Sequence, residues 1–279
     1  MSEQWQTIVS ADQKRASFNL KEILQYKDLV FLYIKRSFMT SYRQTILGPF
    51  WIIINPLFST IVYTLIFGSV AKISTDTLPK FVFYMIGNTT WSLFSTTVTH
   101  NSNVFRANSN IFEKVYFPRI IMPISSAISG LLNYFIQFAL FLVFWAYYLF
   151  FGSYQPTIVL LLIPFLWIEI LVLGTGIGLV ISAVTRRFRD LQMAAEFGLS
   201  LMVYLTPVVY PISEAGGYFR LALLINPMGP IIEAFRYAFF GIGAFEVPFL
   251  FLGLAETILI CWLGVYLFSK TDRMIMDTI

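Results

Sequence analysis

Residues 120–151 read IIMPISSAISGLLNYFIQFALFLVFWAYYLFF, a run without a single Asp, Glu, Lys or Arg. A helix needs about 20 apolar residues to cross the hydrocarbon core of a bilayer, so this stretch is long enough to span with a tilted or extended end. Five further apolar windows cover residues 50–71, 81–99, 157–184, 191–210 and 247–268. We therefore predict an all-α polytopic membrane protein with six transmembrane helices.

The composition agrees with this prediction. Hydrophobic residues make up 57% of the 279 residues and charged residues only 12%, whereas a soluble domain carries about 25% charged residues. The chain has too few charges to cover its own surface, so lipid must cover part of it. We predict two regions: a cytoplasmic N-terminal segment at residues 1–48 and a six-span transmembrane domain at residues 49–279. The first twenty residues lack the apolar core of a secretory signal peptide.

The basic residues predict the orientation, because Lys and Arg concentrate in cytoplasmic loops. Fifteen of them fall on one side of the predicted spans and four on the other. The first group is Lys14, Arg15, Lys21, Lys27, Lys35, Arg36, Arg43, Arg106, Lys114, Arg119, Arg186, Arg187, Arg189, Lys270 and Arg273, and the second is Lys72, Lys80, Arg220 and Arg236. Both termini are therefore expected in the cytoplasm, with an even number of spans.

Residues 19–38 are predicted to form an amphipathic helix ahead of the first span. Asn19 can cap its start, and Glu22 stands three residues later, where a capping box needs a glutamate. Apolar residues recur at three- and four-residue steps, while Lys21 and Lys35 face elsewhere. This pattern is typical of a helix in the membrane interface, although it also fits a soluble helix packed on a partner.

Residues 221–225 and 231–242 are apolar but too short to span, and Asn226-Pro227 and Pro230 interrupt them. Apolar segments of this length suggest re-entrant or interfacial helices, so we predict a re-entrant pair before the last span. Glu233 and Arg236 are three residues apart and can pair with each other on the second short helix.

Catalytic and metal chemistry are poorly supported. His100 is the only histidine, Cys261 is the only cysteine, and no phosphate-binding loop is present. We expect no catalytic residue, metal site or cofactor in this chain, and nucleic-acid binding has little support. Residues 174–178 read GTGIG in mid-span, which favours close helix packing. Pro164 predicts a kink in the fourth span.

Glu169 and Glu256 each lie near the middle of a predicted span. A bare charge there costs at least about 2.5 kcal/mol, so each carboxyl group should be protonated, paired or exposed to water. Two interpretations stay open. The pair can serve a proton relay or a polar conduit lining, or each can form a structural hydrogen bond between helices. The first interpretation would suit a proton-coupled transporter.

Five motifs together carry a family resemblance. They are YRQTILGPFW at 42–51 with Asn55-Pro56, EKVYFPR at 113–119, RFRDL at 187–191, LTPVVYP at 205–211, and Asn226-Pro227 followed by IIEAFR at 231–236. In this order and spacing the chain resembles the type 2 ABC-exporter permeases that export O-antigen, teichoic acid and related polysaccharides. The resemblance covers nearly the whole chain from about residue 29.

The resemblance implies a permease subunit rather than an enzyme, placed in the cytoplasmic (inner) membrane. It implies a homodimer that binds two copies of a separate ATPase, which would hold ATP and Mg. The implied substrate is a lipid-linked glycan, as in O-antigen export for lipopolysaccharide biosynthesis. The same architecture carrying a drug or a lipid is the alternative.

The resemblance also implies roles for particular residues. The loop at residues 108–119 would be the helix that couples to the ATPase, with Phe112, Glu113, Lys114, Tyr116, Phe117 and Arg119 as contacts. The substrate entrance would use Lys35, Arg36 and Arg43, and the glycan conduit would be lined by Trp51, Tyr63, Tyr204 and Tyr210. The cluster at residues 187–190 can be a structural latch or a simple charged anchor.

Overall fold

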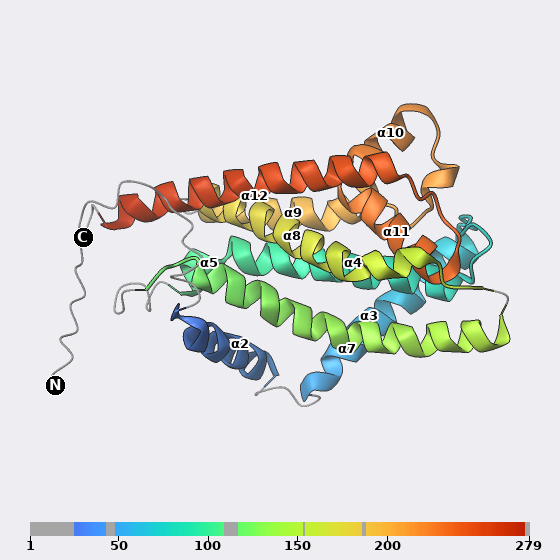
Figure 1. Cartoon of the computed structure of the whole chain (residues 1–279), viewed down its shortest axis with the longest axis horizontal. Coiled ribbons are helices and arrows are strands. Elements are labelled where there is room, and N and C mark those ends of the chain that lie inside the picture. Colours follow the sequence, from blue (N-terminus) through green and yellow to red (C-terminus); the bar gives the residue numbers. More distant parts are fainter. Residues whose placement is uncertain (1–24, 43–47, 109–116, 153, 186–187, 277–279) are drawn as a thin grey trace.

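A computed structural model of the chain describes residues 25–42, 48–108, 117–152, 154–185 and 188–276 (Figure 1). This described part is helical and contains no strand. The longer helices are α2 (Lys27–Tyr42), α3 (Trp51–Tyr63), α4 (Lys80–Ser102), α7 (Ile121–Phe151), α8 (Ile163–Thr185), α9 (Arg189–Met202), α10 (Gly217–Ile225), α11 (Met228–Phe240) and α12 (Val247–Met276). The shorter elements are η1 (Gly48–Phe50), η2 (Thr64–Val70), α5 (Val104–Ala107), η3 (Ile158–Leu162), η4 (Val203–Leu205) and η5 (Ile212–Glu214).

Four helical stretches in the described part are long and apolar enough to cross a membrane: Trp51–Val70, Ile121–Phe151, Ile158–Thr185 and Val247–Thr271. They match four of the six predicted windows. The all-α, multi-pass architecture is therefore confirmed, and the count of six spans stays a prediction. The two remaining windows correspond to α4 and α9. The helix α4 is more polar than a lipid-facing span, and α9 is shorter than its predicted window.

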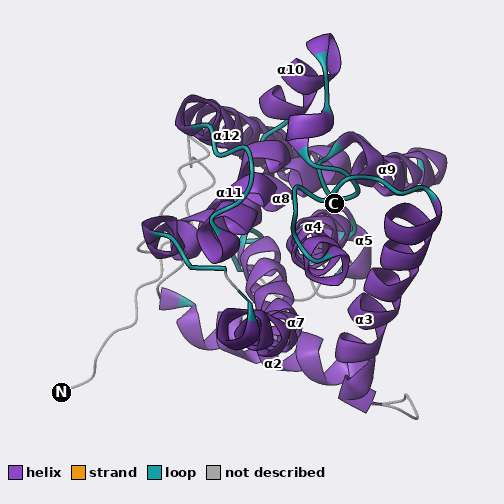
Figure 2. Cartoon of the chain, turned by 90° about the vertical axis from the view of Figure 1, so that its right-hand side faces the viewer, coloured by secondary structure: helices purple, strands orange, loops and turns teal. Residues whose placement is uncertain are grey.

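The helix α4 has 23 residues, which is long enough to span. It lies in the middle of the bundle and contacts α3, α7, α8 and α11 (Figure 2). Most of its side chains are buried, including the polar Asn88, Thr89 and Thr90. Since protein rather than lipid surrounds α4, its sequence can be more polar than that of a peripheral span.

The helix α9 is shorter than the fifth predicted window. It ends at Met202, and the short η4 continues the coil only to Leu205. A continuous helix through residue 210 is not found, because Pro207 disfavours helical backbone at the residue before it. Thr206 is accordingly extended, with φ −130° and ψ 153°.

Two ends of the bundle can be told apart along its long axis. The helices α2 and α5 and the last turns of α12 lie at one end, and α10 and α11 lie at the other (Figure 1). Lys35, Arg106 and Lys270 therefore belong to the first end, and Lys72 and Arg220 to the second. These described residues agree with the predicted division of basic residues, and the first end is the one that we predict to be cytoplasmic.

The glycines of the GTGIG stretch bring α8 close to both neighbouring helices. A Cβ added at Gly174 or Gly178 would lie 2.9 Å or 2.5 Å from the Cβ of Thr97 or Asn101 on α4. A Cβ added at Gly176 would lie 2.8 Å from the Cα of Cys261 on α12. The predicted role of this stretch in close helix packing is therefore confirmed.

The helical coil changes from 3-10 to α-helical geometry next to Pro164, and the kink predicted there stays a prediction. Pro164 is the second residue of α8, just after the 3-10 helix η3. A second proline, Pro56, lies inside α3.

The helices α10 and α11 form the predicted hairpin of two short helices. The side chain of Asn226 organises the turn between them, since its Oδ1 accepts a hydrogen bond from the Met228 N–H and its Nδ2 donates to the Leu205 carbonyl. Gly241 ends α11 in the left-handed conformation with φ 70°, which glycine adopts without steric cost. Almost all of α11 is buried, against α4, η3, α8 and α12.

Candidate functional site

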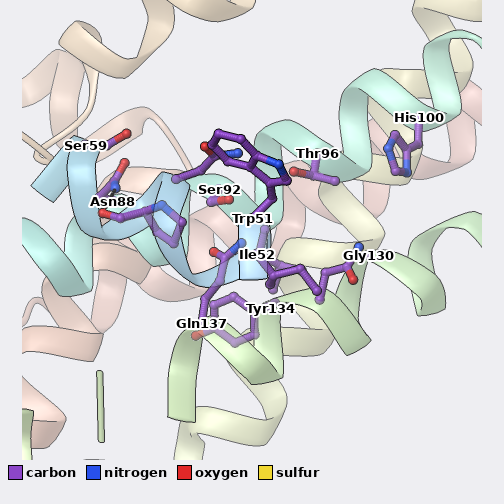
Figure 3. A pocket seen from close by; sticks show the side chains of 14 residues that line it. Trp51, Ile52, Ser59, Asn88, Ser92, Thr96, His100, Gly130, Tyr134 and Gln137 are labelled. Carbon is purple, nitrogen blue, oxygen red and sulfur yellow. Dashed lines mark hydrogen bonds between the residues drawn. The ribbon is translucent and has the colours of Figure 1, made fainter. Parts of the chain in front are cut away.

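A cavity of about 320 Å³ lies between α3, α4 and α7 (Figure 3). Most of its lining side chains are polar or aromatic, and none is Asp, Glu, Lys or Arg. The lining consists of Trp51, Ile52, Asn55, Pro56, Ser59, Asn88, Ser92, Leu93, Thr96, His100, Gly130, Asn133, Tyr134 and Gln137. Trp51, Asn55 and His100 are exposed, whereas Asn88 and Tyr134 are buried, so the cavity is open on one side and closed on the other.

Helical spacing brings these residues together. On α4, the lining residues Asn88, Ser92, Thr96 and His100 follow one another at steps of four residues, with Leu93 beside them. Residues at that spacing share one face of a helix. Trp51, Asn55 and Ser59 repeat the same step on α3. The polar lining residues therefore form one stripe on α3 and one on α4. We did not predict this site, although the four-residue steps are visible in the sequence.

A backbone carbonyl group of α3 also makes the α3 side of the cavity more polar. Pro56 has no N–H, so it cannot donate the helical hydrogen bond to the carbonyl four residues earlier. The carbonyl of Pro56 accepts hydrogen bonds from the Thr60 hydroxyl at 2.7 Å and from Asn88 Nδ2 at 3.4 Å. Beyond Tyr63 the coil widens into the π-helical η2. This face of α3 is thus unusually polar for a spanning helix.

The floor of the cavity comes from α7. Asn133 Oδ1 and Gln137 Oε1 are buried and have no hydrogen-bond partner. Tyr134, between them, accepts a hydrogen bond at its hydroxyl from Trp167 Nε1 at 3.1 Å. An unsatisfied buried polar atom costs about 1–3 kcal/mol. Both oxygens are closed off from solvent, so the polar groups that the cavity offers come from other atoms of its lining.

The four aromatic residues predicted to line a conduit are not gathered in one cavity. Trp51 lines the cavity described above. Tyr63 packs instead against Phe67 and Tyr84, with ring centroids 5.6 Å and 6.4 Å away. The Tyr210 hydroxyl donates to the Tyr204 carbonyl at 2.6 Å. The role of Tyr63, Tyr204 and Tyr210 in a conduit therefore stays a prediction.

The helix α2 packs against α7 at the basic end of the bundle. It continues to Tyr42, beyond the predicted end at residue 38, while Asn19, Glu22 and Arg43 lie outside the described residues. Lys35 and Arg36, predicted at the substrate entrance, are exposed on it. Partial burial raises the pKa of the nearby Tyr33 hydroxyl, and Arg36 opposes this effect.

Phe117 occupies a different position from the one expected of an ATPase contact. It is only 6% exposed and lies in an apolar cluster with Phe105, Ile121 and Phe268. Its ring is 6.2 Å from that of Tyr33 on α2. The ring of Phe117 is therefore packed against α2, and its role as an ATPase contact stays a prediction. Arg119 is half-buried, and Phe112, Glu113, Lys114 and Tyr116 lie outside the described residues.

Glu233 and Arg236 form the predicted ion pair, and it lies deep inside the protein. Arg236 Nη1 is 2.8 Å from Glu233 Oε1, and the two side chains are 1% and 0% exposed. Glu233 also accepts hydrogen bonds from the backbone N–H groups of Ile212 and Ala244. The Arg236 guanidinium lies 3.6 Å from the centroid of the Phe83 ring on α4.

Of the two carboxyl groups predicted in mid-span, Glu169 is buried and Glu256 is half-buried. The Oε1 atom of Glu169 has no hydrogen-bond partner. Neither residue belongs to the ion pairs found among the described residues. The structure therefore does not supply the helix-to-helix hydrogen bond that would explain Glu169, and its role stays open.

A bundle of long apolar helices with an uncharged polar cavity is the architecture of a membrane permease. The sequence matches the ABC-2 type transporter family over residues 28–240, and the chain belongs to this family. It is 27% identical over 263 residues to the O-antigen export system permease protein RfbA of Myxococcus xanthus, covering 93% of this chain and 98% of that protein.

Two further similarities extend this comparison. RfbA of Klebsiella pneumoniae is 26% identical over 91% of this chain and 96% of its own length. The polysialic acid transport protein KpsM of Escherichia coli is 24% identical over 73% of this chain and 78% of its own length. The chain is therefore a membrane subunit of the ABC transporter class. Transporters of this class work with an ATPase.

Proposed function

We propose that this chain is the transmembrane subunit of an ATP-driven exporter that moves a lipid-linked polysaccharide, such as an O-antigen or a teichoic-acid-like glycan, across the cytoplasmic membrane. Its similarity to the O-antigen permeases extends over nearly the full length of both partners. The observation that carries the proposal is the uncharged polar cavity inside an apolar bundle. A polysaccharide that crosses the membrane needs many hydrogen-bonding partners along its path. Neutral polar groups can supply these hydrogen bonds without binding the glycan so tightly that it stops moving.

The partners follow from the same proposal. Two copies of the chain would pair and bind two copies of an ATPase that holds ATP and Mg, while this chain contributes no cofactor. The end of the bundle with α2 and α5 would face the cytoplasm, together with both termini. Lys35, Arg36 and Arg43 would attract the diphosphate of the lipid carrier at this end, because Lys and Arg pair strongly with phosphate oxygens.

Co-purification with a candidate ABC ATPase subunit from the same organism tests the proposed assembly. We expect a stable complex of two permease and two ATPase subunits whose ATP hydrolysis depends on the permease. Charge reversal by Glu113→Lys in the predicted coupling segment should weaken the complex, because the loop docks on the ATPase. The matched control is Glu214→Lys at the other end, where Glu214 is exposed, and it should leave the complex intact.

The exporter proposal also has an outcome that would contradict it. If the ATPase does not bind and transport continues without ATP, the exporter proposal fails. The proton-coupled alternative would then gain support, with the buried and unpartnered Glu169 as its first residue to test.

A further inference from the structure

The helix α9 lies on the outside of the bundle (Figure 2) and has one buried side chain near its start. Among its described side chains, at residues 190–202, only Gln192 is buried, with 4% of its surface exposed. The side chains on the other faces are exposed, and those of Ala195 and Leu199 are half-buried. The position of α9 within the chain therefore depends strongly on what Gln192 contacts.

The Gln192 amide joins three helices at the basic end of the bundle. Its Nε2 donates hydrogen bonds to the Ser102 hydroxyl oxygen and to Glu196 Oε1, both at 3.0 Å. Its Oε1 accepts a hydrogen bond from the Thr185 hydroxyl at 3.0 Å. Ser102 is the last residue of α4 and Thr185 the last residue of α8. This Gln192 cluster (Ser102, Thr185, Gln192 and Glu196) thus holds the start of α9 against the ends of two other helices.

The inner part of the cluster is nearly closed off from water. Ser102, Thr185 and Gln192 are each 5% exposed or less. Only an amide side chain combines two N–H donors with a carbonyl acceptor, and Gln192 uses all three groups here. A bond that breaks in such a place leaves a buried polar atom without a partner, which is unfavourable. Packed contacts of this kind are either formed or broken and do not stretch gradually.

The outer part of the cluster reaches the helix that leads into the predicted coupling segment. Glu196 Oε1 accepts a second hydrogen bond, from Asn103 Nδ2 at 3.2 Å, and Asn103 lies between α4 and α5. The positive charge of Arg106 on α5 attracts the Glu196 carboxylate. From α5 the chain continues directly into residues 108–119. A displacement of that segment therefore moves groups that interact with Glu196.

At its far end α9 leads to the α10–α11 hairpin. The helix continues through η4 to Leu205, whose carbonyl accepts a hydrogen bond from Asn226 Nδ2 at 3.1 Å. Asn226 is also the residue that organises the turn of the hairpin. A helix is stiff enough to carry a movement of its first turn to its last. The helix α9 thus connects the basic end of the bundle with the hairpin at the opposite end.

We propose that Gln192 is a positioning residue for transport: it makes α9 move together with the ends of α4 and α8 when the ATPase displaces the coupling segment. The helix passes this movement to the α10–α11 hairpin through Leu205 and Asn226. Gln192 therefore links ATP hydrolysis to glycan movement by acting through α9. This inference rests on the proposed function, since it requires an ATPase that docks at residues 108–119.

The first test compares ATP hydrolysis with glycan movement in proteoliposomes that contain the permease and its ATPase. Gln192→Leu keeps the approximate size of the side chain and removes all three hydrogen bonds. We expect the complex to assemble and to hydrolyse ATP within about twofold of the unchanged rate, while the glycan moved per ATP falls about tenfold or more. Ser102→Ala removes one of the three bonds and should lower the same ratio by a smaller factor.

The second test follows the movement itself by hydrogen exchange and mass spectrometry. A non-hydrolysable ATP analogue should change the exchange of backbone amides both in residues 108–119 and in α9 of the unchanged complex. In Gln192→Leu the change at residues 108–119 should remain, and the change in α9 should be lost. A side chain that only stabilises the fold would not separate the two segments in this way.

The matched control is Gln155→Leu, which removes an exposed amide in the turn between α7 and η3. It should keep both the ratio of glycan to ATP and the exchange pattern. A normal ratio in Gln192→Leu, an equal loss of hydrolysis and movement, or no response of α9 to the ATP analogue in the unchanged complex overturns the inference. If Gln192→Leu does not fold, Ser102→Ala and the unchanged complex decide by the same criteria.

Failure of this inference can be told apart from failure of the proposed function. If the unchanged complex moves no glycan with ATP, the proposed function fails. If it moves the glycan with ATP and Gln192→Leu moves as much glycan per ATP, the proposed function survives and only the role of Gln192 is wrong.

Discussion

Replacing Arg236 with alanine is expected to destabilise the folded protein by about 3–5 kcal/mol. The substitution leaves the carboxylate of Glu233 buried at 0% exposure without its cation. It also removes the hydrogen bond from Arg236 to the Val208 carbonyl and the guanidinium that covers the Phe83 ring. Thermal unfolding of the purified protein in detergent should show a midpoint lower by on the order of 10 °C.

The chain provides a matched control for this effect in a second ion pair. Arg220 Nη2 is also 2.8 Å from a carboxylate oxygen, that of Glu246, but the side chains are 46% and 32% exposed. Exposed pairs contribute only about 0–1 kcal/mol, so Arg220→Ala should hardly move the midpoint. Similar losses from Arg236→Ala and Arg220→Ala would contradict the assignment of Arg236 as a buried core charge.

A double substitution separates two costs of Arg236→Ala: the loss of the ion-pair interaction, and the burial of the Glu233 carboxylate without a partner. Glu233→Gln combined with Arg236→Met leaves no uncompensated charge, and the methionine fills part of the vacated volume. Buried ion pairs replaced as a unit cost much less than pairs broken on one side. We expect the double variant to be more stable than Arg236→Ala alone.

Substituting valine for Gly176 should prevent correct packing of α8 on α12. Its Cβ would lie 2.8 Å from the Cα and 2.9 Å from the backbone N of Cys261. From the other side, a Cβ at Gly264 would lie 2.4 Å from the Gly176 carbonyl oxygen. These neighbours are backbone atoms, so a whole helix must move, at a cost of about 3 kcal/mol or more.

The measurement is the yield of monodisperse protein on size-exclusion chromatography, with Gly198→Val as the control. A Cβ at Gly198 on α9 meets nothing within 4 Å, so this variant carries the same change in helix propensity without the clash. We expect Gly176→Val to aggregate or be lost and Gly198→Val to be recovered normally. Normal recovery of both would show that α8 and α12 do not pack as closely as described.

Much of the fold could be predicted from local patterns. Continuous apolar runs located α7, α8 and α12, and Asn226-Pro227 located the turn of the hairpin. The glycines at 174, 176 and 178 predicted close packing. A glycine has no side chain, so a neighbouring helix can approach closely, and this holds without knowing which helix the neighbour is. What these signals share is that each depends on a few neighbouring residues.

The features that the local patterns did not supply depend on distant parts of the chain. Glu233 and Arg236 have the spacing of a pair, but their burial comes from Phe83 and the backbone of Val208 and Ile212. Phe117 looked like an accessible aromatic anchor because only the fold places α2 over it. Burial by residues that are distant in the sequence produces no periodic pattern from which it could be predicted.

The cavity was missed for a different reason. Averaging hydropathy over a window of about 20 residues hides single polar residues at four-residue steps, such as Ser92 and Thr96 on α4. Only the convergence of α3, α4 and α7 shows that their stripes face one space. Trp51 was the one predicted lining residue that the structure places there.

The most direct test of the central claim is transport by purified protein. Permease and ATPase would be reconstituted together into proteoliposomes with a radiolabelled lipid-linked glycan, and translocation would be followed as protection from an added glycosidase. We predict movement of the glycan that requires ATP and both subunits, and that stops with an ATPase unable to hydrolyse ATP. Glycan movement that is unchanged without ATP, or none with both subunits active and ATP present, would contradict the account.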